Sequence, residues 1–478
     1  MNMDKSNSYT TFNKDSSGIL STWPLLFSTA VISTTFSSIV VNMPFLSEMM
    51  WKDGIFHAFE MGTIITVKTW LVAFSGILFG IFADKYSRRY LFVFSTFFLG
   101  LSYFINGFIP EGRGNITYIL LLICQGVAGF ALGARYPLLS SFINDHVAVS
   151  HRSRFFGIDM ALQQFFLVVG MILSTFLFQL NKWREFFWGI GLLVSIGAIF
   201  MFFFIKEPKR GSRMEQLESV LRDETAIYDY KINKKTLRKT MLSPTNIIAL
   251  IEGIFTRAAL GMTIFLIVTY LQVEKNVAAS STSVFMTVFA LPGAFAGNLA
   301  LSRLSDYLGK KNVKNRSYLI AFSILGLVGM FSLMFFVPLP VLTADQGKNF
   351  LFLMSRREFW VIGALLFFER ALQGVYGTNQ SPILQIINLP EAQGKITSWN
   401  QFLETIGNGL GPLIAGVLLV ISSNNFQFTA IVCILIGIPG SILWLLSLLT
   451  LTKDVNRIES ILEIRAKEIT ENANKKPI

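Results

Sequence analysis

Twelve long apolar segments dominate the chain and decide the solvent in which it can fold. An α-helix needs roughly 20 apolar residues to cross a hydrocarbon core of about 30 Å. Only 15% of the residues are charged and 52% are hydrophobic, whereas soluble domains carry about 25% charged residues. We therefore predict an all-α integral membrane protein with twelve transmembrane helices, which begin near Trp23, Glu60, Tyr90, Thr117, Phe155, Glu185, Thr245, Thr282, Ser317, Phe359, Thr397 and Phe428.

A polar stretch between the sixth and seventh segments divides the chain into two halves of six. It is the one long internal interruption, and its apolar spacing predicts an amphipathic helix at 213–228. The expected organisation is a cytoplasmic tail, a six-helix bundle, a cytoplasmic linker, a second six-helix bundle and a second tail, at 1–21, 22–205, 206–244, 245–451 and 452–478.

The distribution of Lys and Arg predicts the orientation. With both ends in the cytoplasm, the cytoplasmic segments carry 29 of these residues and the outer loops carry 8. Cytoplasmic loops hold the excess of positive charge in membrane proteins. We expect cytoplasmic termini and a place in the plasma membrane. The net charge of +12 then faces anionic lipid, so the bilayer is the expected partner and no nucleic acid is needed.

Cysteine and histidine usage gives no sign of a metal or catalytic centre. Cys124 and Cys433 each lie inside an apolar segment, and the three histidines, His57, His146 and His151, lack a second ligand at a zinc spacing. No Ser/His/Asp arrangement stands out, and the phosphate-binding pattern Gly-x4-Gly-Lys-Ser/Thr is missing from the sequence. We expect no cofactor, no metal and no enzyme activity.

A short basic turn occurs twice, each time after an apolar segment. The two copies are Gly80-Ile-Phe-Ala-Asp84-Lys-Tyr-Ser-Arg88-Arg89 and Ser302-Arg-Leu-Ser-Asp306-Tyr-Leu-Gly309-Lys310-Lys311. Their aspartates are 222 residues apart, close to half the chain length. A motif repeated at this spacing indicates two related halves.

The first turn resembles the signature Gly-x-Leu-Ala-Asp-Arg-x-Gly-Arg-Arg of major facilitator superfamily transporters. Three further segments are similar to elements of that family: Arg370 to Gly374, Asp145 with Arg152, and Gly407 to Pro412, the last in the eleventh segment in place of the fifth. The resemblance implies two pseudo-symmetric six-helix bundles, a monomer, and secondary active transport by alternating access. A sugar-porter-like and a Spinster-like subfamily both remain open.

The resemblance also implies that the repeated turns form a cytoplasmic gate. A carboxylate at a helix start accepts backbone N–H groups and opposes the positive end of the helix. We expect Arg88 and Arg89 to pair with Asp145, and the second turn to pair with Glu391. The expected gate residues are Gly80, Asp84, Arg88, Arg89, Arg135, Asp145, Arg152, Asp306, Lys310, Lys311 and Glu391.

Polar residues inside the apolar segments are the candidates for substrate binding or coupling. A charge at the bilayer centre costs about 2.5–3.5 kcal/mol, so it needs a partner or a water-filled cavity. Lys68 either extends to the interface or faces a cavity, and Arg135 has Asp159 as an alternative partner. The candidate site residues are Lys68, Glu252, Arg257, Glu369, Arg370, Asn379, Gln380, Asn400 and Glu404.

These residues favour a particular class of solute. The cations Lys68, Arg257 and Arg370 suit a small anionic or zwitterionic organic molecule. A buried glutamate can carry H⁺ as a coupling ion, so we expect a symporter or an antiporter. Two alternatives stay open, a transporter-like receptor or scaffold without transport, and a lysolipid or sugar carrier of the same superfamily.

Overall fold

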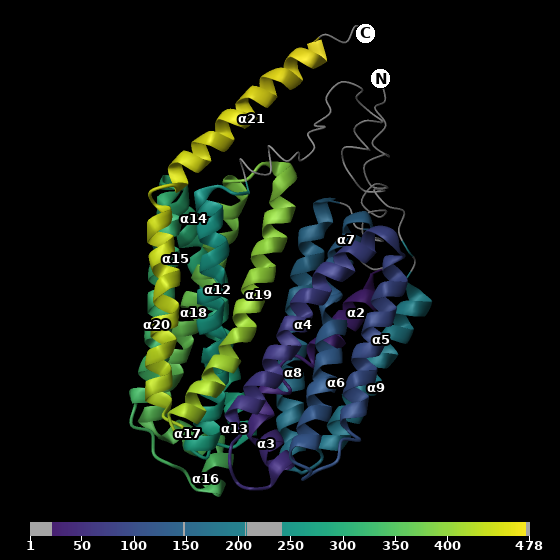
Figure 1. Ribbon diagram of the computed structural model, residues 1–478, viewed down its shortest axis with the longest axis vertical. Helices are drawn as coiled ribbons and strands as arrows, with labels where there is room; N and C mark the ends of the chain where they lie inside the picture. The colour runs from purple at the N-terminus through teal and green to yellow at the C-terminus, as the bar shows by residue number, and fades with distance from the viewer. Residues whose placement is uncertain (1–21, 147–148, 206, 208–240, 475–478) are drawn as a thin grey trace, which may run out of the picture. The chain divides into compact units, whose positions relative to one another are not determined.

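The structure, a computed structural model, describes residues 22–146, 149–205, 207 and 241–474 (Figure 1). Every regular element within these ranges is helical, as the apolar segments predict. The expected first tail and the expected linker helix at 213–228 lie outside the described residues, and the expected second tail is described as far as residue 474. Residues 458–469, whose apolar spacing also predicts a helix, are helical as part of α21 (Leu451–Asn474).

The helices form two units, described here one at a time. Unit 1 combines residues 1–39 with 71–227. Within it α5 packs along α9, and α2 contacts both α8 and α9. Its helices are α2 (Trp23–Ser33), the second part of α4 (Ala58–Lys85), α5 (Arg88–Asn106), α6 (Asn115–Gly133), α7 (Arg135–His146), α8 (Val149–Gln179) and α9 (Trp183–Phe204).

Unit 2 combines residues 40–70 with 228–478. In it α12 packs against α19 and α20, while α15 and α13 pack against α18. Its helices are η1 (Val40–Asn42), α3 (Met43–Trp51), the first part of α4, α12 (Pro244–Thr269), η2 (Tyr270–Glu274), α13 (Ala279–Phe295), η3 (Ala296–Ala300), α14 (Leu301–Lys311), α15 (Lys314–Leu333), η4 (Met334–Phe336), α16 (Ala344–Lys348), α17 (Phe350–Ser355), α18 (Arg357–Ile386), α19 (Pro390–Ile421), α20 (Phe426–Ser447) and α21.

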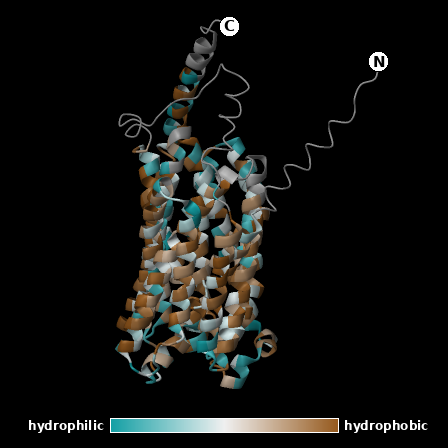
Figure 2. Ribbon diagram, turned by 90° about the vertical axis from the view of Figure 1, so that its right-hand side faces the viewer, coloured by the Kyte–Doolittle hydropathy of each residue, from teal (hydrophilic) through white to brown (hydrophobic). Residues whose placement is uncertain are grey.

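Ten helical spans in the described residues are long and apolar enough to cross a membrane. The predicted segments near Trp23 and Tyr90 are not among them. Helix α2 has only 11 residues, and α5 begins with Arg88 and Arg89, which lower its hydropathy. Hydrophobic residues dominate the middle of the helices, and hydrophilic ones gather toward their ends (Figure 2), as expected where backbone groups bond within each helix and side chains face lipid.

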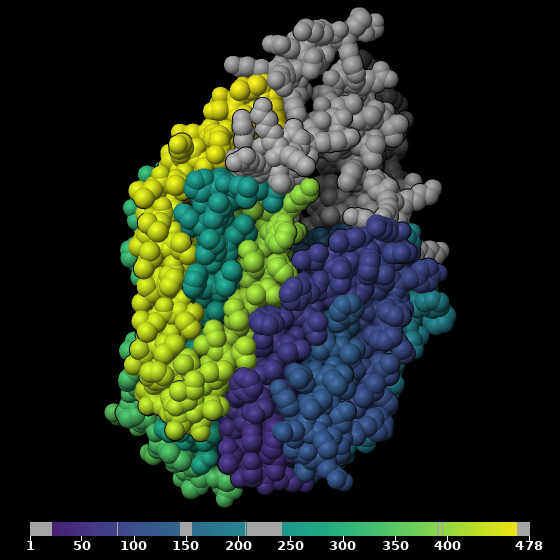
Figure 3. Space-filling view, viewed as in Figure 1, coloured from purple at the N-terminus to yellow at the C-terminus, as the bar shows by residue number. Residues whose placement is uncertain are grey.

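Glycines allow α19 to contact helices on two of its sides. A Cβ atom on Gly407 or Gly411 would lie less than 3.0 Å from the backbone of α12. A Cβ atom on Gly416 of α19 would come equally close to the backbone of α4. In the same way, a Cβ atom on Gly62 of α4 would come equally close to the backbone of α19. Helix α19 therefore packs at backbone distance against both α12 and the first part of α4 (Figure 3).

Two hydrogen bonds fix the α4–α19 contact within unit 2. The Thr66 hydroxyl donates to the Gly409 carbonyl at 2.7 Å, and the Trp70 indole N–H donates to the Ile406 carbonyl at 3.0 Å. From Leu71 onward, α4 belongs to unit 1. One continuous helix thus takes part in both units.

Candidate functional site

An ion pair between α12 and α19 lies at the centre of the candidate site. Both Nε and Nη2 of Arg257 contact Oε2 of Glu404, at 2.8 and 2.7 Å. The other carboxylate oxygen of Glu404 accepts a hydrogen bond from the Asn400 amide at 2.7 Å. Gly253 lies one helical turn before Arg257, and a Cβ atom there would be 2.9 Å from Glu404 Cγ. The missing side chain at Gly253 gives Glu404 the space it occupies beside Arg257.

The two partners of this ion pair differ in their access to solvent. The Arg257 side chain is 30% exposed, whereas the Glu404 side chain is 10% exposed. The guanidinium also lies over the Tyr376 ring of α18, 5.6 Å from its centroid. A guanidinium presents a planar fork of donors that matches a carboxylate. Arg257 is therefore the more solvent-accessible member of the ion pair.

Glu252 is a second carboxylate on α12, and it has no cation bound to it. The residue is fully buried, and its Oε1 accepts a hydrogen bond from Thr256 one turn later. Its Oε2 lies near the Tyr376 hydroxyl and the Trp444 indole N–H. None of these three groups makes a hydrogen bond with both a normal distance and a normal angle. A buried carboxylate without a cation is costly, so this group is suited to carrying a proton.

Glu369 and Arg370 form a separate ion pair on α18. Arg370 Nε lies 3.1 Å from Glu369 Oε2, although consecutive helical residues point in different directions. Arg370 Nη1 also donates to Gln373 Oε1 at 2.8 Å. Glu369 is fully buried, so this pair contacts the interior of unit 2.

The nine candidate site residues all lie in unit 2, but the structure does not bring all of them together. Lys68 is half-buried on α4, between the two residues that bond to α19. Gln380 is 5% exposed, and Asn379 bonds elsewhere, as described below. The sequence analysis missed Thr256, Tyr376 and Trp444. Only Thr256 had a signal, its spacing of one helical turn from Glu252.

The first basic turn is organised by an acid that the sequence analysis did not select. Glu207 Oε1 contacts Arg88 Nε at 3.0 Å, and Oε2 accepts bonds from the Ser87 hydroxyl at 2.9 Å and the Arg89 backbone N–H at 2.8 Å. Arg88 also donates to the Ser141 carbonyl at 2.8 Å. Glu207 therefore caps the start of α5, the role expected of Asp84.

The expected partners in this turn lie outside what the structure describes. The side chains of Asp84, Asp145 and Arg152 are not among the described ones. Among the described side chains Arg88 pairs with Glu207, and the expected pairing with Asp145 stays a prediction. The available signal was the position of Glu207 just after the sixth apolar segment, where an acid can reach the start of a neighbouring helix.

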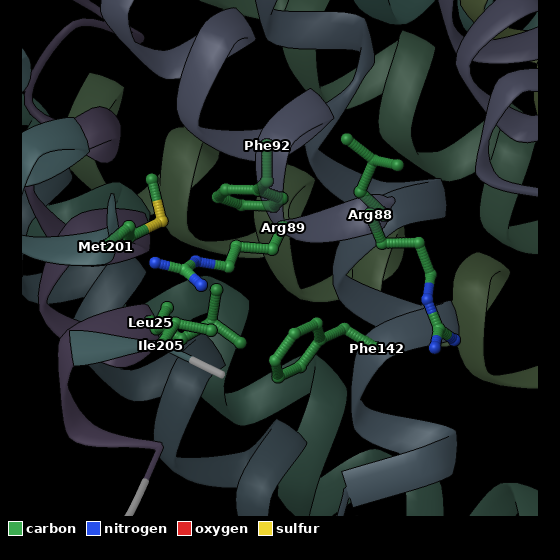
Figure 4. A pocket seen from close by; sticks show the side chains of 8 residues that line it. Leu25, Arg88, Arg89, Phe92, Phe142, Met201 and Ile205 are labelled. Carbon is green, nitrogen blue, oxygen red and sulfur yellow. The ribbon is translucent and has the colours of Figure 1, made fainter. Parts of the chain in front are cut away.

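The two arginines of this turn point in different directions (Figure 4). Arg89 Nη2 donates to the Phe202 carbonyl, and its guanidinium lies 5.4 Å from the centroid of the Phe202 ring. Both arginines border a small pocket that is otherwise apolar, lined by Leu25, Phe92, Leu138, Phe142, Met201 and Ile205. Arg88 thus links the start of α5 to α7 and to the segment after α9, while Arg89 packs on an aromatic surface.

Replacing Glu207 by glutamine is expected to lower the stability of the protein by about 1–2 kcal/mol. Partial burial alone would raise the pKa of Glu207, but hydrogen bonds from Arg89, Arg88 and Ser87 outweigh it and hold the pKa below its usual value. A depressed pKa in the folded state stabilises the protein at neutral pH, and this contribution is lost as the pH falls through that pKa.

Thermal unfolding at pH 7 and at pH 4 measures this effect. The difference between wild type and Glu207→Gln should be largest at pH 7 and shrink at the lower pH. Glu185→Gln, at an exposed position on α9, is the control. Equal unfolding temperatures for wild type and Glu207→Gln at pH 7 would show that the cap contributes nothing.

The second basic turn uses a different cation from the ones expected. Asp306 Oδ1 pairs with Arg316 Nη2 at 2.9 Å. Arg316 Nη1 donates to Asn379 Oδ1 at 3.2 Å, and the Asn379 amide donates to the Ser305 hydroxyl at 3.0 Å. These contacts join α14, α15 and α18. Asn379 therefore belongs to the second basic turn and not to the Arg257–Glu404 cluster.

Other expected gate residues take varied positions. Lys311 Nζ lies 4.4 Å from the centroid of the Tyr307 ring, and Lys310 is exposed on α14. A Cβ atom on Gly80 would meet nothing within 4 Å. The side chain of Glu391, the expected partner, is outside the described ones. Among the described side chains the second turn forms the ion pair Asp306–Arg316, and the expected contact with Glu391 stays a prediction.

The alternative partner for Arg135 is the one that the structure shows. Arg135 Nη2 lies 3.4 Å from Asp159 Oδ2, and Nη1 donates to Gln163 Oε1 at 3.0 Å. The Thr29 hydroxyl donates to Asp159 Oδ1 at 2.7 Å. This buried network joins α2, α7 and α8 within unit 1. Among the described residues, no group of three or more His, Cys, Asp or Glu side chains is placed to hold a metal ion.

Apolar helices that bury ion pairs between them define a polytopic membrane protein of the transport class. The sequence model of the Major Facilitator Superfamily matches residues 25–355, and the chain belongs to this superfamily. The fold agrees with that of a bacterial homologue of the human lysosomal transporter Spinster, solved in an inward-facing and unoccupied conformation. That match has a TM-score of 0.61 at 15% identity and covers 92% of this chain and 98% of the other.

Two of three curated relatives are named as transporters. A probable 4-methylmuconolactone transporter of Cupriavidus pinatubonensis is 24% identical over 259 residues, 53% of this chain and 55% of the relative. Multidrug resistance protein 1 of Bacillus subtilis is 21% identical over 365 residues, 76% and 82% of the two chains. A proline/betaine transporter of Escherichia coli is 34% identical over 73 residues, 15% of each. The chain thus spans about half the length of the first relative, and the superfamily to which it belongs is one of transporters and not of enzymes.

Proposed function

We propose that this transporter moves a small anionic or zwitterionic organic solute by alternating access, with Arg257, Glu404 and Asn400 at the substrate site. The observation that carries the proposal is the ion pair between the solvent-accessible guanidinium of Arg257 and the more buried carboxylate of Glu404. The names of the relatives, a lactone transporter and a proline/betaine transporter, support a small polar solute.

Alternating access requires contacts that form in one state and separate in another. The two basic turns, with their pairs Arg88–Glu207 and Asp306–Arg316, supply candidate contacts for the cytoplasmic gate. The packing of α4 on α19 supplies a candidate contact for the opposite gate. An exposed ion pair contributes roughly 0–1 kcal/mol and a hydrogen bond to a charged group about 1.5–3 kcal/mol, so a few such contacts together can bias a two-state equilibrium. Two bundles at 22–205 and 245–451, cytoplasmic termini, a plasma-membrane location and a monomer complete the proposal.

Uptake by the purified full chain in proteoliposomes tests this function. Radiolabelled proline, glycine betaine and small carboxylates are offered with and without an inward H⁺ gradient. Saturable uptake of at least one of them, lost on replacement of Arg257, is the expected result. Saturable binding without any uptake would overturn transport and favour the receptor or scaffold alternative.

Glu252 is the first candidate for coupling to H⁺, and Glu252→Gln is expected to remove the stimulation of uptake by an inward H⁺ gradient. The amide keeps the hydrogen bond to Thr256 but cannot take up a proton. Uptake at equal pH on both sides should change much less. Uptake that responds to the gradient as in wild type would exclude Glu252 and leave Glu369 and Glu404 as the remaining candidates.

A further inference from the structure

The charges around Arg257 do not balance, and the imbalance restricts what can bind there. Two carboxylates, Glu252 and Glu404, lie near one guanidinium. Glu404 is bound to Arg257. Glu252 accepts a hydrogen bond from Thr256 through one oxygen, and its other oxygen accepts none with both a normal distance and a normal angle. A solute that brings only negative charge would give the single guanidinium a second anion if Glu252 holds a proton, and a third if it does not. A solute that also brings a positive charge would not.

The geometry allows a solute carboxylate to take the place of Glu404. Both contacts from Arg257 go to one oxygen, Oε2, while Asn400 holds the other oxygen, Oε1. Releasing Oε2 therefore leaves Glu404 anchored by Asn400. The incoming carboxylate would then accept hydrogen bonds from the same two N–H groups of Arg257, which the guanidinium presents in one plane.

The released Glu404 would then be a buried carboxylate without a cation. A cationic group attached to the same solute can supply the missing positive charge and pair with Glu404. The cluster thus offers one place for a carboxylate and an adjacent one for a positive charge.

We infer, on the basis of the proposed transport function, that the substrate is a zwitterion whose carboxylate replaces Glu404 on Arg257 and whose positive charge pairs with the released Glu404. Because the zwitterion has no net charge, the exchange leaves the net charge of the cluster unchanged. Binding therefore requires no proton on Glu404, and it discriminates against simple carboxylates of the same shape.

Matched pairs of small molecules test this charge requirement. Glycine betaine is compared with 3,3-dimethylbutanoate, in which carbon replaces the charged nitrogen, and proline with cyclopentanecarboxylate. Binding to the purified full chain is measured by calorimetry and by thermal stabilisation at pH 6 and pH 8. We expect at least one zwitterion to bind at least tenfold more tightly than its matched anion, with the same affinity at both pH values.

Glu404→Gln supplies the second arm. It removes the partner of the positive charge but keeps the hydrogen bond to Asn400, so the preference for the zwitterion over its matched anion should disappear or invert. Glu358→Gln, at the start of α18 and away from the cluster, is the control and should keep the preference.

Three results would overturn the inference. They are equal or tighter binding of the matched anions by wild type, a preference that survives in Glu404→Gln, and binding of none of the zwitterions. Because binding is measured without a gradient, the inference and the transport function fail separately. Zwitterion preference without uptake would contradict transport alone, and uptake without the preference would contradict the inference alone.

Discussion

Replacing Arg257 by glutamine is expected to reduce solute uptake at least about 100-fold and to destabilise the protein. The change leaves the Glu404 carboxylate buried without its cation, and breaking a buried ion pair from one side costs about 3–5 kcal/mol. Each 1.4 kcal/mol corresponds to about a tenfold change in an equilibrium constant. Glu404→Gln should act in the same direction, because it leaves the Arg257 guanidinium without its carboxylate.

The double variant Arg257→Gln/Glu404→Gln separates stability from function. Two amides can pair with each other, so the melting temperature in detergent should recover most of the loss seen in either single variant. Uptake should stay as low as in Arg257→Gln, because the anion-binding group is missing. Glu358→Gln is the matched control for a single charge removed. Wild-type uptake in the double variant would show that the ion pair is structural only.

A bulky side chain at Gly62 is expected to reduce uptake at least tenfold and to destabilise the protein by about 1–3 kcal/mol, the usual effect of overpacking. A Cβ atom at this position would contact the Pro412 carbonyl and lie 3.4 Å from Leu413 Cα. Leucine therefore cannot be accommodated while α4 lies on α19. Gly62→Ala should show a smaller effect in the same direction.

The control for Gly62→Leu is Gly329→Leu on α15, where a Cβ atom would meet nothing within 4 Å. Uptake in proteoliposomes and thermal unfolding are measured for both variants. Loss of uptake in Gly62→Leu alone is the expected outcome. If the two leucine variants behave alike, the close approach of α4 and α19 has no part in transport.

The helical architecture could be predicted from the sequence because it follows from hydrophobic length. Most described helices begin within a few residues of the expected starts, since a span needs a minimum run of apolar residues. The same criterion did not reveal that the first helix ends at Ser33 and that the chain then forms two separate helices, η1 and α3. Segment length alone does not show where a helix breaks.

The candidate site could be predicted only in part, because ion pairs join residues far apart in the chain. The cost of an intramembrane charge identified Arg257 and Glu404 separately, but nothing in the sequence joined α12 to α19. The missing side chain at Gly253 leaves the space beside Arg257 that Glu404 occupies. Because glycines are common in membrane helices, Gly253 did not stand out in the sequence. Glu207 was missed because its role depends on the neighbouring start of α5.

A reversible cross-link between α4 and α19 tests alternating access most directly. Cysteines replace Phe59 and Val420, which lie at exposed positions on the two helices near Gly416, in a chain whose own Cys124 and Cys433 are serine. A short bis-methanethiosulfonate links the two, and a reductant releases the link. Our account predicts that uptake stops when the link is complete and returns after reduction. Unchanged uptake with the link intact would contradict it.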